Sequence, residues 1–497
     1  MSGARTCDVI VVGAGNAAMA AALTARQAGA SVVVLEAADP DNAGGNTRYA
    51  AGQMRTTYRG VDDLLEIVSD LTPAEIASSD FGSYLREDYL EDVGRLTQYR
   101  CNPELAETLV DGSHATLKWM REQGVRFQAS YGRQAVKVDG RYKFWGGLPC
   151  EVWGGGPGLL EAYYAAAKKA GIEVRHHTHV LGLVLDGRRV AGVHCALHGD
   201  TFELRAHSVV LACGGFEANA EMRARYLGPN WDLAKVRGTK FNTGQGLAMA
   251  LSIGASAAGH WSGAHSTCWD LNSPETGDLR VGDGYQKFSY PIGIMVNARG
   301  ERFVDEGADL QVYTYSRIGR EILAQPGMFA WQVFDQRAVP LLRDEYRIRE
   351  VTKVAGATLE ELAGRMEGVD ARGFLKTMED YNRAVPPGEP QINISTRDGR
   401  STAGLALPKS NWSYRIDRGP FEAYAVTTGI TFTFGGLRIS RSAQVLDAAW
   451  APIDGLYAAG EIVGGLFYGG YPGGTGLVSG AVFGRIAGRE AAAALRN

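Results

Sequence analysis

The chain opens with Asp8-Val-Ile-Val-Val-Gly13-Ala-Gly15-Asn16-Ala-Ala18 and continues to Val32-Val-Val-Leu-Glu36. An apolar run that ends in glycines, an alanine-rich segment and a second apolar run that ends in an acid are typical of the strand, turn, helix and strand of a dinucleotide-binding unit. Gly13 permits the tight turn, and Gly15 lets backbone N–H groups approach a pyrophosphate at the start of the helix. Glu36 stands where a carboxylate can accept hydrogen bonds from a ribose.

The composition is that of a globular protein with two domains. The chain has 497 residues, of which 45% are hydrophobic and 21% are charged, and this length is long for one domain. The net charge of −4 argues against a nucleic-acid-binding surface. The 65 glycines exceed the usual share of ~7%. They cluster at the ends of apolar runs, which indicates close approaches of the backbone to a ligand.

We expect a cytoplasmic protein without a transmembrane segment or a metal centre. No apolar run reaches the roughly 18 residues of a transmembrane helix, and the first predicted strand begins too early for a signal peptide. The six cysteines show no C-x-x-C spacing, which favours scattered reduced thiols. His176, His177 and His179 are close in sequence, but no carboxylate ligand neighbours them, so a metal site is not expected.

The combination of an apolar strand with a glycine turn recurs along the chain. An apolar strand that ends in glycines recurs at 208–216, and a glycine turn that opens a helix recurs at 242–250. At 455–477 an apolar strand again ends in glycine and an acid, as at the start of the chain. Such turns deliver backbone N–H groups from several strand ends to one ligand. The 3.6-residue periodicity predicts helical structure over 60–125, 159–170 and 478–495.

The segment 259–419 differs in character from the rest of the chain. It is richer in aromatic, His and Arg residues and in turns, and it has few long apolar runs. We therefore predict that 1–258 and 420–497 form the two parts of a cofactor-binding domain. The segment between them is predicted to form a second domain, inserted between those two parts, whose aromatic, His and Arg side chains could line a polar pocket.

These motifs together resemble the fumarate reductase and succinate dehydrogenase flavoprotein superfamily over nearly the whole chain. The stretch 428–436 and the last glycine loop, 464–475, are most similar to its tricarballylate dehydrogenase-like branch. The resemblance implies an α/β fold: a Rossmann-like FAD-binding domain in two sequence halves, with an inserted α+β capping domain. The shared motifs are G-A-G-N-A-A, G-G-N-T, L-A-C-G-G-F, T-G-Q-G, R-F-V-D-E, G-L-Y-A-A-G-E and G-G-T-G-L.

The same resemblance implies which residues bind FAD. Glu36 is expected at the adenosine ribose, Asn46 and Thr47 beside the flavin, and Glu461 at the ribityl chain. Membrane-bound relatives attach FAD through a histidine near Asn46, and no histidine stands there, so non-covalent FAD is expected. The expected FAD-binding residues are Gly13, Gly15, Asn16, Ala17, Glu36, Ala37, Gly45, Asn46, Thr47, Val180, Ala212, Gly214, Gly460, Glu461, Thr475, Gly476, Leu477 and Val478.

The chain departs from fumarate reductases at the substrate-binding positions. Those enzymes carry two arginines and a histidine where this chain has Tyr315, Tyr471 and Phe432, so succinate and fumarate are not the expected substrates. His265 matches a substrate-binding histidine. Tyr315 and Tyr471 resemble tyrosines of ketosteroid dehydrogenases, in which one removes a proton and the other binds a carbonyl oxygen. Packing in the core or cap is the alternative for both side chains.

The resemblance implies an FAD-dependent dehydrogenase or reductase acting on CH–CH groups next to a carbonyl or carboxylate of a small organic substrate. We expect Tyr315 to transfer the proton, Tyr471 to contact the oxygen and His265 to donate a hydrogen bond to the substrate. A tyrosine with a reference pKa of ~10 needs a nearby cation or relay to act as a base at neutral pH. Lys287 and Arg317 are the candidates for that cation.

The substrate and the electron partner are left open. A tricarballylate-like substrate would require several converging arginines, for which Arg133, Arg280 and Arg302 are the candidates, whereas an enone-type substrate suits the tyrosines. No second glycine motif for a nicotinamide is present, so the electron donor or acceptor is unknown. Two alternatives are a flavin oxidase that uses O2 and a flavin electron-transfer subunit without substrate chemistry of its own.

Overall fold

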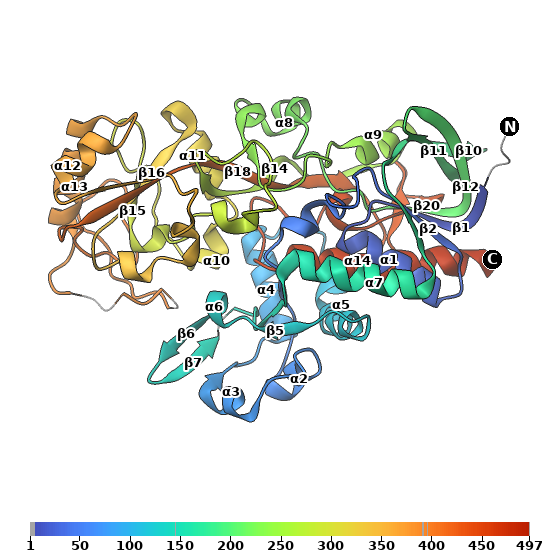
Figure 1. Ribbon diagram of the computed structural model, residues 1–497, viewed down its shortest axis with the longest axis horizontal. Helices are drawn as coiled ribbons and strands as arrows, with labels where there is room; N and C mark the ends of the chain where they lie inside the picture. The colour runs from blue at the N-terminus through green and yellow to red at the C-terminus, as the bar shows by residue number, and fades with distance from the viewer. Residues whose placement is uncertain (1–4, 145, 390–391, 395, 497) are drawn as a thin grey trace. The chain divides into compact units, whose positions relative to one another are not determined.

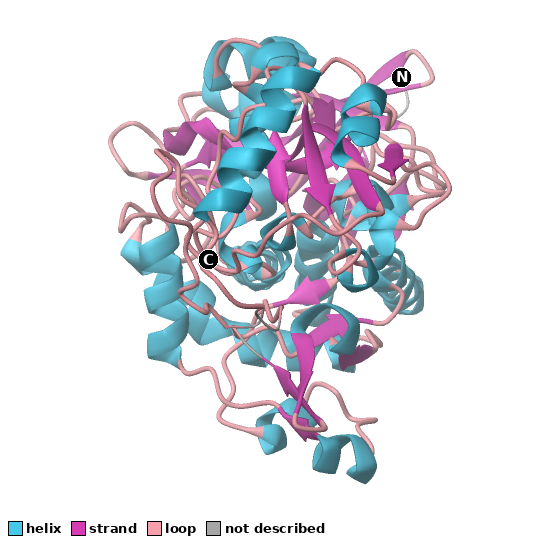
Figure 2. Ribbon diagram, turned by 90° about the vertical axis from the view of Figure 1, so that its left-hand side faces the viewer, coloured by secondary structure: helices cyan, strands magenta, loops and turns pink. Residues whose placement is uncertain are grey.

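The computed structural model describes residues 5–144, 146–389, 392–394 and 396–496, and the chain divides into two compact units. Unit 1 is drawn from 1–229, 238–264 and 432–497, and unit 2 from 230–237 and 265–431. Helices and strands are both distributed through the chain (Figure 2).

The core of unit 1 is an eight-stranded sheet whose central strands are parallel. These strands lie in the order β9 (Glu173–Arg175), β2 (Val32–Leu35), β1 (Arg5–Val12), β12 (Asp200–Leu211) and β20 (Pro452–Ala458). The hairpin β10 (Thr178–Asp186) and β11 (Arg189–Leu197) and the short strand β19 (Gln444–Leu446) flank them. Val209 of β12 pairs with Leu456 of β20, so both sequence halves contribute to one sheet.

Three helices of unit 1 lie beside one another: α1 (Asn16–Gln27), α7 (Gly155–Ala170) and α14 (Thr475–Ala493) (Figure 1). Both α7 and α14 begin earlier than the periodicity predicts. The sequence predicts a helix that begins at Leu159, but the glycines before it belong to the first turn of α7. A Cβ on Gly156 would lie 1.7 Å from the main-chain oxygen of Thr47. These glycines therefore serve close packing of the helix start.

The remaining parts of unit 1 include the mainly helical segment that was predicted between 60 and 125. Its helices are α2 (Val61–Leu65), α3 (Pro73–Ser78), α4 (Arg86–Leu96) and α5 (Pro103–Glu122). Two three-stranded sheets accompany these helices. The first contains, in order, β3 (Gln53–Met54), β8 (Cys150–Val152) and β5 (Phe127–Ala129). The second contains β4 (Ser79–Asp80), β7 (Arg141–Phe144) and β6 (Ala135–Val138). The short helices α6 (Tyr131–Gln134), α8 (Ala220–Leu227) and α9 (Gln245–Ser252) complete the unit.

Unit 2 is built on a mixed sheet centred on β18 (Phe421–Leu437). The strands that pair with it are β13 (Lys235–Val236), β14 (Ala257–Asp270), β16 (Ala330–Phe334) and β17 (Lys353–Gly356), and β15 (Ile294–Val296) pairs with β16. The α-helices of unit 2 are α10 (Gln311–Thr314), α11 (Ile318–Leu323), α12 (Leu359–Arg365) and α13 (Ala371–Ala384).

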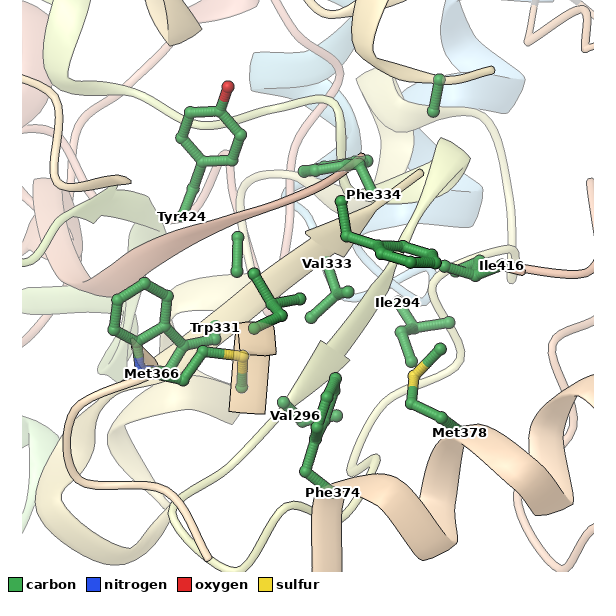
Figure 3. Packing of buried hydrophobic residues seen from close by; sticks show 14 of the residues in the cluster. Ile294, Val296, Trp331, Val333, Phe334, Met366, Phe374, Met378, Ile416 and Tyr424 are labelled. Atoms are coloured by element: carbon green, nitrogen blue, oxygen red, sulfur yellow. The ribbon is translucent and has the colours of Figure 1, made fainter. Parts of the chain in front are cut away.

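Unit 2 has a hydrophobic core of its own. Ile294 and Val296 of β15 and Val333 of β16 are fully buried, and Phe374 and Met378 of α13 point toward them (Figure 3). Because the alternate residues of a strand share one face, the short strands present a continuous apolar surface to the helix. An α+β unit with its own core is what the sequence predicts for the inserted segment.

The edges of the two units differ from the predicted domain boundaries. The boundaries at 258/259 and 419/420 precede the unit edges at 264/265 and 431/432, and 230–237 joins unit 2. The physical reason is that β14 and β18 each continue from one unit into the other, so no turn marks the passage. Within the described part of the chain, every helix is too short or too polar to cross a bilayer.

Candidate functional site

The first glycine turn joins β1 to α1 and is held to the end of β2. Gly13 has a φ of +101°, and a Cβ there would lie 2.4 Å from the main-chain oxygen of Ala212. The carboxylate of Glu36 accepts hydrogen bonds from the backbone N–H of Ala14 and of Ala38, both at 2.9 Å. Burial raises the pKa of Glu36, and these amides oppose that shift. The carboxylate expected at the ribose therefore also shapes the turn.

The N-termini of α1 and α14 meet in the same region of unit 1. Asn16 donates from its backbone N–H to Thr47 Oγ1 at 3.0 Å and from Nδ2 to the main-chain oxygen of Leu477 at 2.7 Å. Both helices follow a glycine and lack a side-chain cap or an acidic residue in the first turn. Such helix starts attract anionic groups because their N–H groups and dipole are not neutralised locally.

A network of polar side chains links four loops of unit 1. Glu217 Oε1 accepts hydrogen bonds from Asn46 Nδ2 at 2.7 Å and Asn242 Nδ2 at 2.6 Å. Glu461 Oε1 accepts from the backbone N–H of Thr433 at 2.8 Å and from its hydroxyl at 3.3 Å. Asn242 Nδ2 also lies 3.4 Å from Glu461 Oε2. The predicted residues Asn46 and Glu461 thus belong to one network.

Tyr471 lies in an aromatic cluster of unit 1. Its ring contacts Phe432 edge-on at 5.1 Å and Phe467 at 5.3 Å between centroids, and Phe432 contacts Phe434 at 5.4 Å. Tyr471 is 7% exposed. Phe432 therefore packs against Tyr471, and the rings of Phe434 and Phe467 extend the cluster.

The other two predicted catalytic residues contact each other in unit 2. The ring of Tyr315, just after α10, lies edge-on to the imidazole of His265 at 5.1 Å and to Phe288 at 5.1 Å. His265 is fully buried on β14. Burial first, and then the charge of Arg237, lower its pKa well below the ordinary value. His265 is therefore a neutral hydrogen-bonding group at neutral pH.

Arg237 is a functional candidate that the sequence reasoning missed. Its guanidinium binds Asp283 through two hydrogen bonds, at 2.7 Å and 2.9 Å, and lies over the ring of Phe288, 5.7 Å from its centroid. It is the cation that acts on His265. It follows a strand of only two residues, β13, which no periodicity could reveal.

Structural partners hold three of the cations proposed from the sequence, Lys287, Arg302 and Arg280. Lys287 is fully buried, its ammonium donates to the main-chain oxygens of Gly284 and Gln286 at 3.1 Å and 3.2 Å, and burial lowers its pKa to about 8. Arg317 is exposed. Arg302 binds Glu306, and Arg280 is largely exposed and binds Asp278. The arginines proposed for a tricarboxylate thus have other roles, while Arg133 lies in α6 of unit 1.

The remaining predicted FAD residues all lie in unit 1. Val180 lies on β10, where it pairs with Cys195 of β11. Thr178 of the same strand donates its backbone N–H to the main-chain oxygen of Glu36 at 2.9 Å. The others flank the turns and helix starts already described: Gly15, Ala17, Ala37, Gly45, Ala212, Gly214, Gly460, Thr475, Gly476 and Val478.

This donor set fits FAD. A Cβ on Gly45 or on Gly476 would meet nothing nearer than 3.8 Å, so backbone is accessible at both loops. The buried Asn16 Oδ1 has no hydrogen-bond partner among the described residues, as expected of a group that awaits a ligand. Glu217 and Asn242 were missed, although Glu217 directly follows the glycine turn 214–216. Among the described residues, no group of three or more His, Cys, Asp or Glu side chains could hold a metal ion.

The chain is similar to known FAD-binding proteins. A model of the FAD binding domain family matches residues 8–478. The chain is 32% identical to the probable fumarate reductase Ifc3 of Shewanella frigidimarina, covering 98% of this chain and 75% of the relative. It is 29% identical to an NADH:fumarate oxidoreductase of Klebsiella pneumoniae, of whose length it spans about half (48%), with 99% of this chain covered.

Two further relatives carry names of dehydrogenases. The chain is 30% identical to the 4-oxocyclohexanecarboxylate 2-dehydrogenase of Sinomonas cyclohexanicum, covering 98% of this chain and 93% of the relative. Among solved structures, the 3-ketosteroid Δ4-(5α)-dehydrogenase from Rhodococcus jostii RHA1 has a TM-score of 0.70 at 26% identity, covering 98% of this chain and 97% of that one.

Proposed function

The chain belongs to the FAD binding domain family, in a superfamily of oxidoreductases that act on C–C bonds next to carbonyl or carboxylate groups, and we propose that its own substrate is a small ketone or the corresponding enone. The observation that carries this proposal is the contact of Tyr315 with the buried, neutral His265. Two relatives that match over nearly their full lengths are named after ketone substrates. Their names support a ketone as the substrate class of this chain.

FAD, when bound, would accept a hydride from the substrate or donate one to it. In the proposal, Tyr315 moves a proton at the carbon next to the carbonyl, and Tyr471 donates a hydrogen bond to the carbonyl oxygen. A donor held at the oxygen where negative charge develops contributes strongly to such reactions. His265, as a neutral imidazole, holds the substrate. The rings of Phe288 and Phe432 pack edge-on against Tyr315 and Tyr471, respectively.

A small ketone fits these residues better than a tricarboxylate. Two of the three candidate arginines have structural partners, since Arg302 binds Glu306 and Arg280 binds Asp278. Arg237 is already paired with Asp283 by two hydrogen bonds. A substrate with three negative charges would compete with these carboxylates for Arg302, Arg280 and Arg237, and burying a charge without a partner is strongly unfavourable.

The test is the anaerobic reduction of the flavin by cyclic ketones, including 4-oxocyclohexanecarboxylate. The loss of flavin absorbance measures this reduction. Replacing Tyr315 with Phe removes the proton-transfer group, and we expect the rate of flavin reduction to fall by roughly 10²–10⁴-fold while ketone binding is retained. Tyr313→Phe, two residues earlier on α10, is the control and should reduce at the wild-type rate. Wild-type reduction in Tyr315→Phe would show that another group transfers the proton.

The same measurement separates the alternatives. An oxidase would release hydrogen peroxide in step with turnover in air, whereas a dehydrogenase would require an added electron acceptor. An electron-transfer subunit without substrate chemistry would show no bleaching with any ketone or carboxylic acid, although its FAD would still be reduced by dithionite. We also propose that FAD is held without a covalent bond, because the loop 45–49 offers no histidine; denatured protein should then release all its flavin.

A further inference from the structure

Glu217 and Glu461 are carboxyl groups from distant parts of the sequence that meet inside unit 1. Glu217 is fully buried, and both side chains contact the amide Nδ2 of Asn242, at 2.6 Å and 3.4 Å. Asn46 Nδ2 adds a second donor to Glu217 Oε1 at 2.7 Å. Asn46 and Asn242 therefore both donate to the same oxygen of Glu217, Oε1.

The other oxygen, Glu217 Oε2, is buried and receives no hydrogen bond from any residue that the structure describes. A buried acceptor without a donor costs roughly 1–3 kcal/mol, so native structures rarely leave one. A proton on the neighbouring carboxyl would supply the missing hydrogen bond. Glu461 keeps acceptor capacity on Oε1, where the N–H and hydroxyl of Thr433 bind.

Electrostatics requires the same proton. Burial, followed by the charge of Glu217, raises the pKa of Glu461 well above its ordinary value, and burial also raises the pKa of Glu217. Two adjacent carboxylates in a site of low polarity cannot both ionise near neutral pH. The glycine turn fits closely round the pair, because a Cβ on Gly215 would lie 2.2 Å from Glu461 Oε1 and 2.3 Å from Thr433 Oγ1.

We propose that Glu217 and Glu461 hold one proton between them, carried by Glu461 and donated to Glu217 Oε2, and that this hydrogen bond positions Glu461 for the ribityl chain of FAD. Glu217 is then a positioning residue that acts through Glu461. The inference uses the proposed function only for the placement of FAD beside Glu461, and it is independent of the proposed proton transfer by Tyr315.

Other charged groups near the pair have their own partners. Arg223 of α8 donates from Nη1 to the main-chain oxygen of Glu217. Arg48, in the loop that carries Asn46, donates to the main-chain oxygen of Ala43. Glu36 accepts from two backbone amides, and burial raises the pKa of Cys213 to about 12, so its thiol is neutral. Because burial raises the pKa of Glu36 as well, the glutamine variants of the pair are what distinguish its titration from that of Glu36.

The first test is infrared spectroscopy of the FAD-loaded protein at neutral pH. Wild type should show the carbonyl band of a protonated buried carboxyl. Glu217→Gln places an amide N–H against Glu461, which then ionises, so the band should be lost; Glu461→Gln should lose it as well and serves if the first variant does not fold. Glu221→Gln, on the exposed surface of α8, is the matched control and should keep the band.

The second test is the affinity for FAD as a function of pH, followed by flavin fluorescence. In the proposal the shared proton positions Glu461 for FAD, so the singly protonated pair binds FAD more tightly than the fully ionised pair. FAD affinity therefore falls as pH rises through the raised pKa of the FAD-free pair. Wild type should lose FAD affinity at high pH by up to about tenfold per pH unit, the limit for one proton. Glu217→Gln should show a flat profile, whereas Tyr315→Phe and Glu221→Gln should follow wild type.

Several results would overturn the proposal: no carboxyl band in wild type, a band that persists in both glutamine variants, or an unchanged pH profile in Glu217→Gln. None of these measurements depends on turnover. Failure of the ketone proposal would appear instead as absent flavin reduction with the band and the pH profile intact.

Discussion

His265 shows how a single buried residue makes the stability of the protein depend on pH. Its imidazole is fully buried, and burial together with Arg237 lowers its pKa well below the ordinary value. Above about pH 6.5, the reference value for histidine, the residue is neutral in both folded and unfolded chains and contributes nothing. As pH falls below that value, the unfolded chain takes up a proton that the folded chain does not, so stability decreases.

We therefore predict that His265→Gln flattens the acid branch of the stability profile. The thermal midpoint of wild type should fall between about pH 7 and pH 5, around the reference pKa of histidine, and the variant should lose less over that interval. His179→Gln, at an exposed position of β10, is the control and should follow wild type. Parallel curves for wild type and His265→Gln would mean that other groups govern the acid loss.

At the residue scale, the sequence predicted members of the site but not their partners. Glu461 was predicted from the motif that contains it, whereas Glu217 was missed because its role depends on Asn46, Asn242 and Glu461, which only the fold brings together. Arg237 was missed for the same reason. Sequence periodicity identifies elements, and it carries no information about which distant side chains meet.

At the scale of elements, the packing of α14 on α1 depends on glycines spaced four residues apart. Residues four apart lie on one face of a helix, and this face of α14 carries Gly480, Gly484 and Gly488. A Cβ on Gly484 would lie 2.4 Å from the main-chain oxygen of Ala17, and one on Gly488 would lie 2.1 Å from that of Ala21. The two helices therefore approach to a separation that only glycine permits.

We predict that Gly488→Ala destabilises the protein by about 1–3 kcal/mol, because backbone must move to accommodate the methyl group. The thermal midpoint of the FAD-loaded protein measures the effect. Gly364→Ala on α12, where a Cβ would meet nothing within 4 Å, is the matched control and should be neutral or stabilising by up to about 1 kcal/mol. Equal midpoints for Gly488→Ala and wild type would show that the helices can separate without loss.

Glycines also explain why two helix starts differ from the prediction. Glycine is usually a signal for a turn, so the sequence predicts that α7 and α14 begin after the glycines that their first turns contain. The existence and the type of both helices were predicted correctly. Their boundaries were not, because the glycines serve contacts such as that of Gly156 with Thr47, which sequence alone does not show.

At the scale of the whole molecule, the fold class was predicted because its signals repeat. The opening unit and the motifs at 455–477 predicted one cofactor domain in two halves, and the pairing of β12 with β20 confirms a shared sheet. The domain edges were not predicted in the same way, since β14 and β18 continue from one unit into the other. A change in composition marks a boundary only where the environment of the side chains changes. Because β14 and β18 are continuous strands, the composition does not change at the residue where one unit ends.

This organisation leads to a prediction about the removal of FAD. All expected FAD contacts lie in unit 1, whereas unit 2 has a separate core that includes Val333 and Phe374. A ligand stabilises only the state that binds it, by about 2.7 kcal/mol when its free concentration is roughly 100 times its Kd. Loss of FAD should therefore weaken unit 1 and leave the core of unit 2 unaffected.

Hydrogen exchange followed by mass spectrometry, with holoprotein and apoprotein compared, measures this difference by segment. We expect faster exchange without FAD in peptides that cover 13–18, 45–49 and 212–217, because their amides lose a ligand or the order that it imposes. Peptides from β16 and α13 should exchange at the same rate in both forms. Restoring FAD should reverse the change, which controls for damage during removal. A uniform increase over both units would contradict the prediction, because it would mean that the core of unit 2 depends on the cofactor-bound state of unit 1.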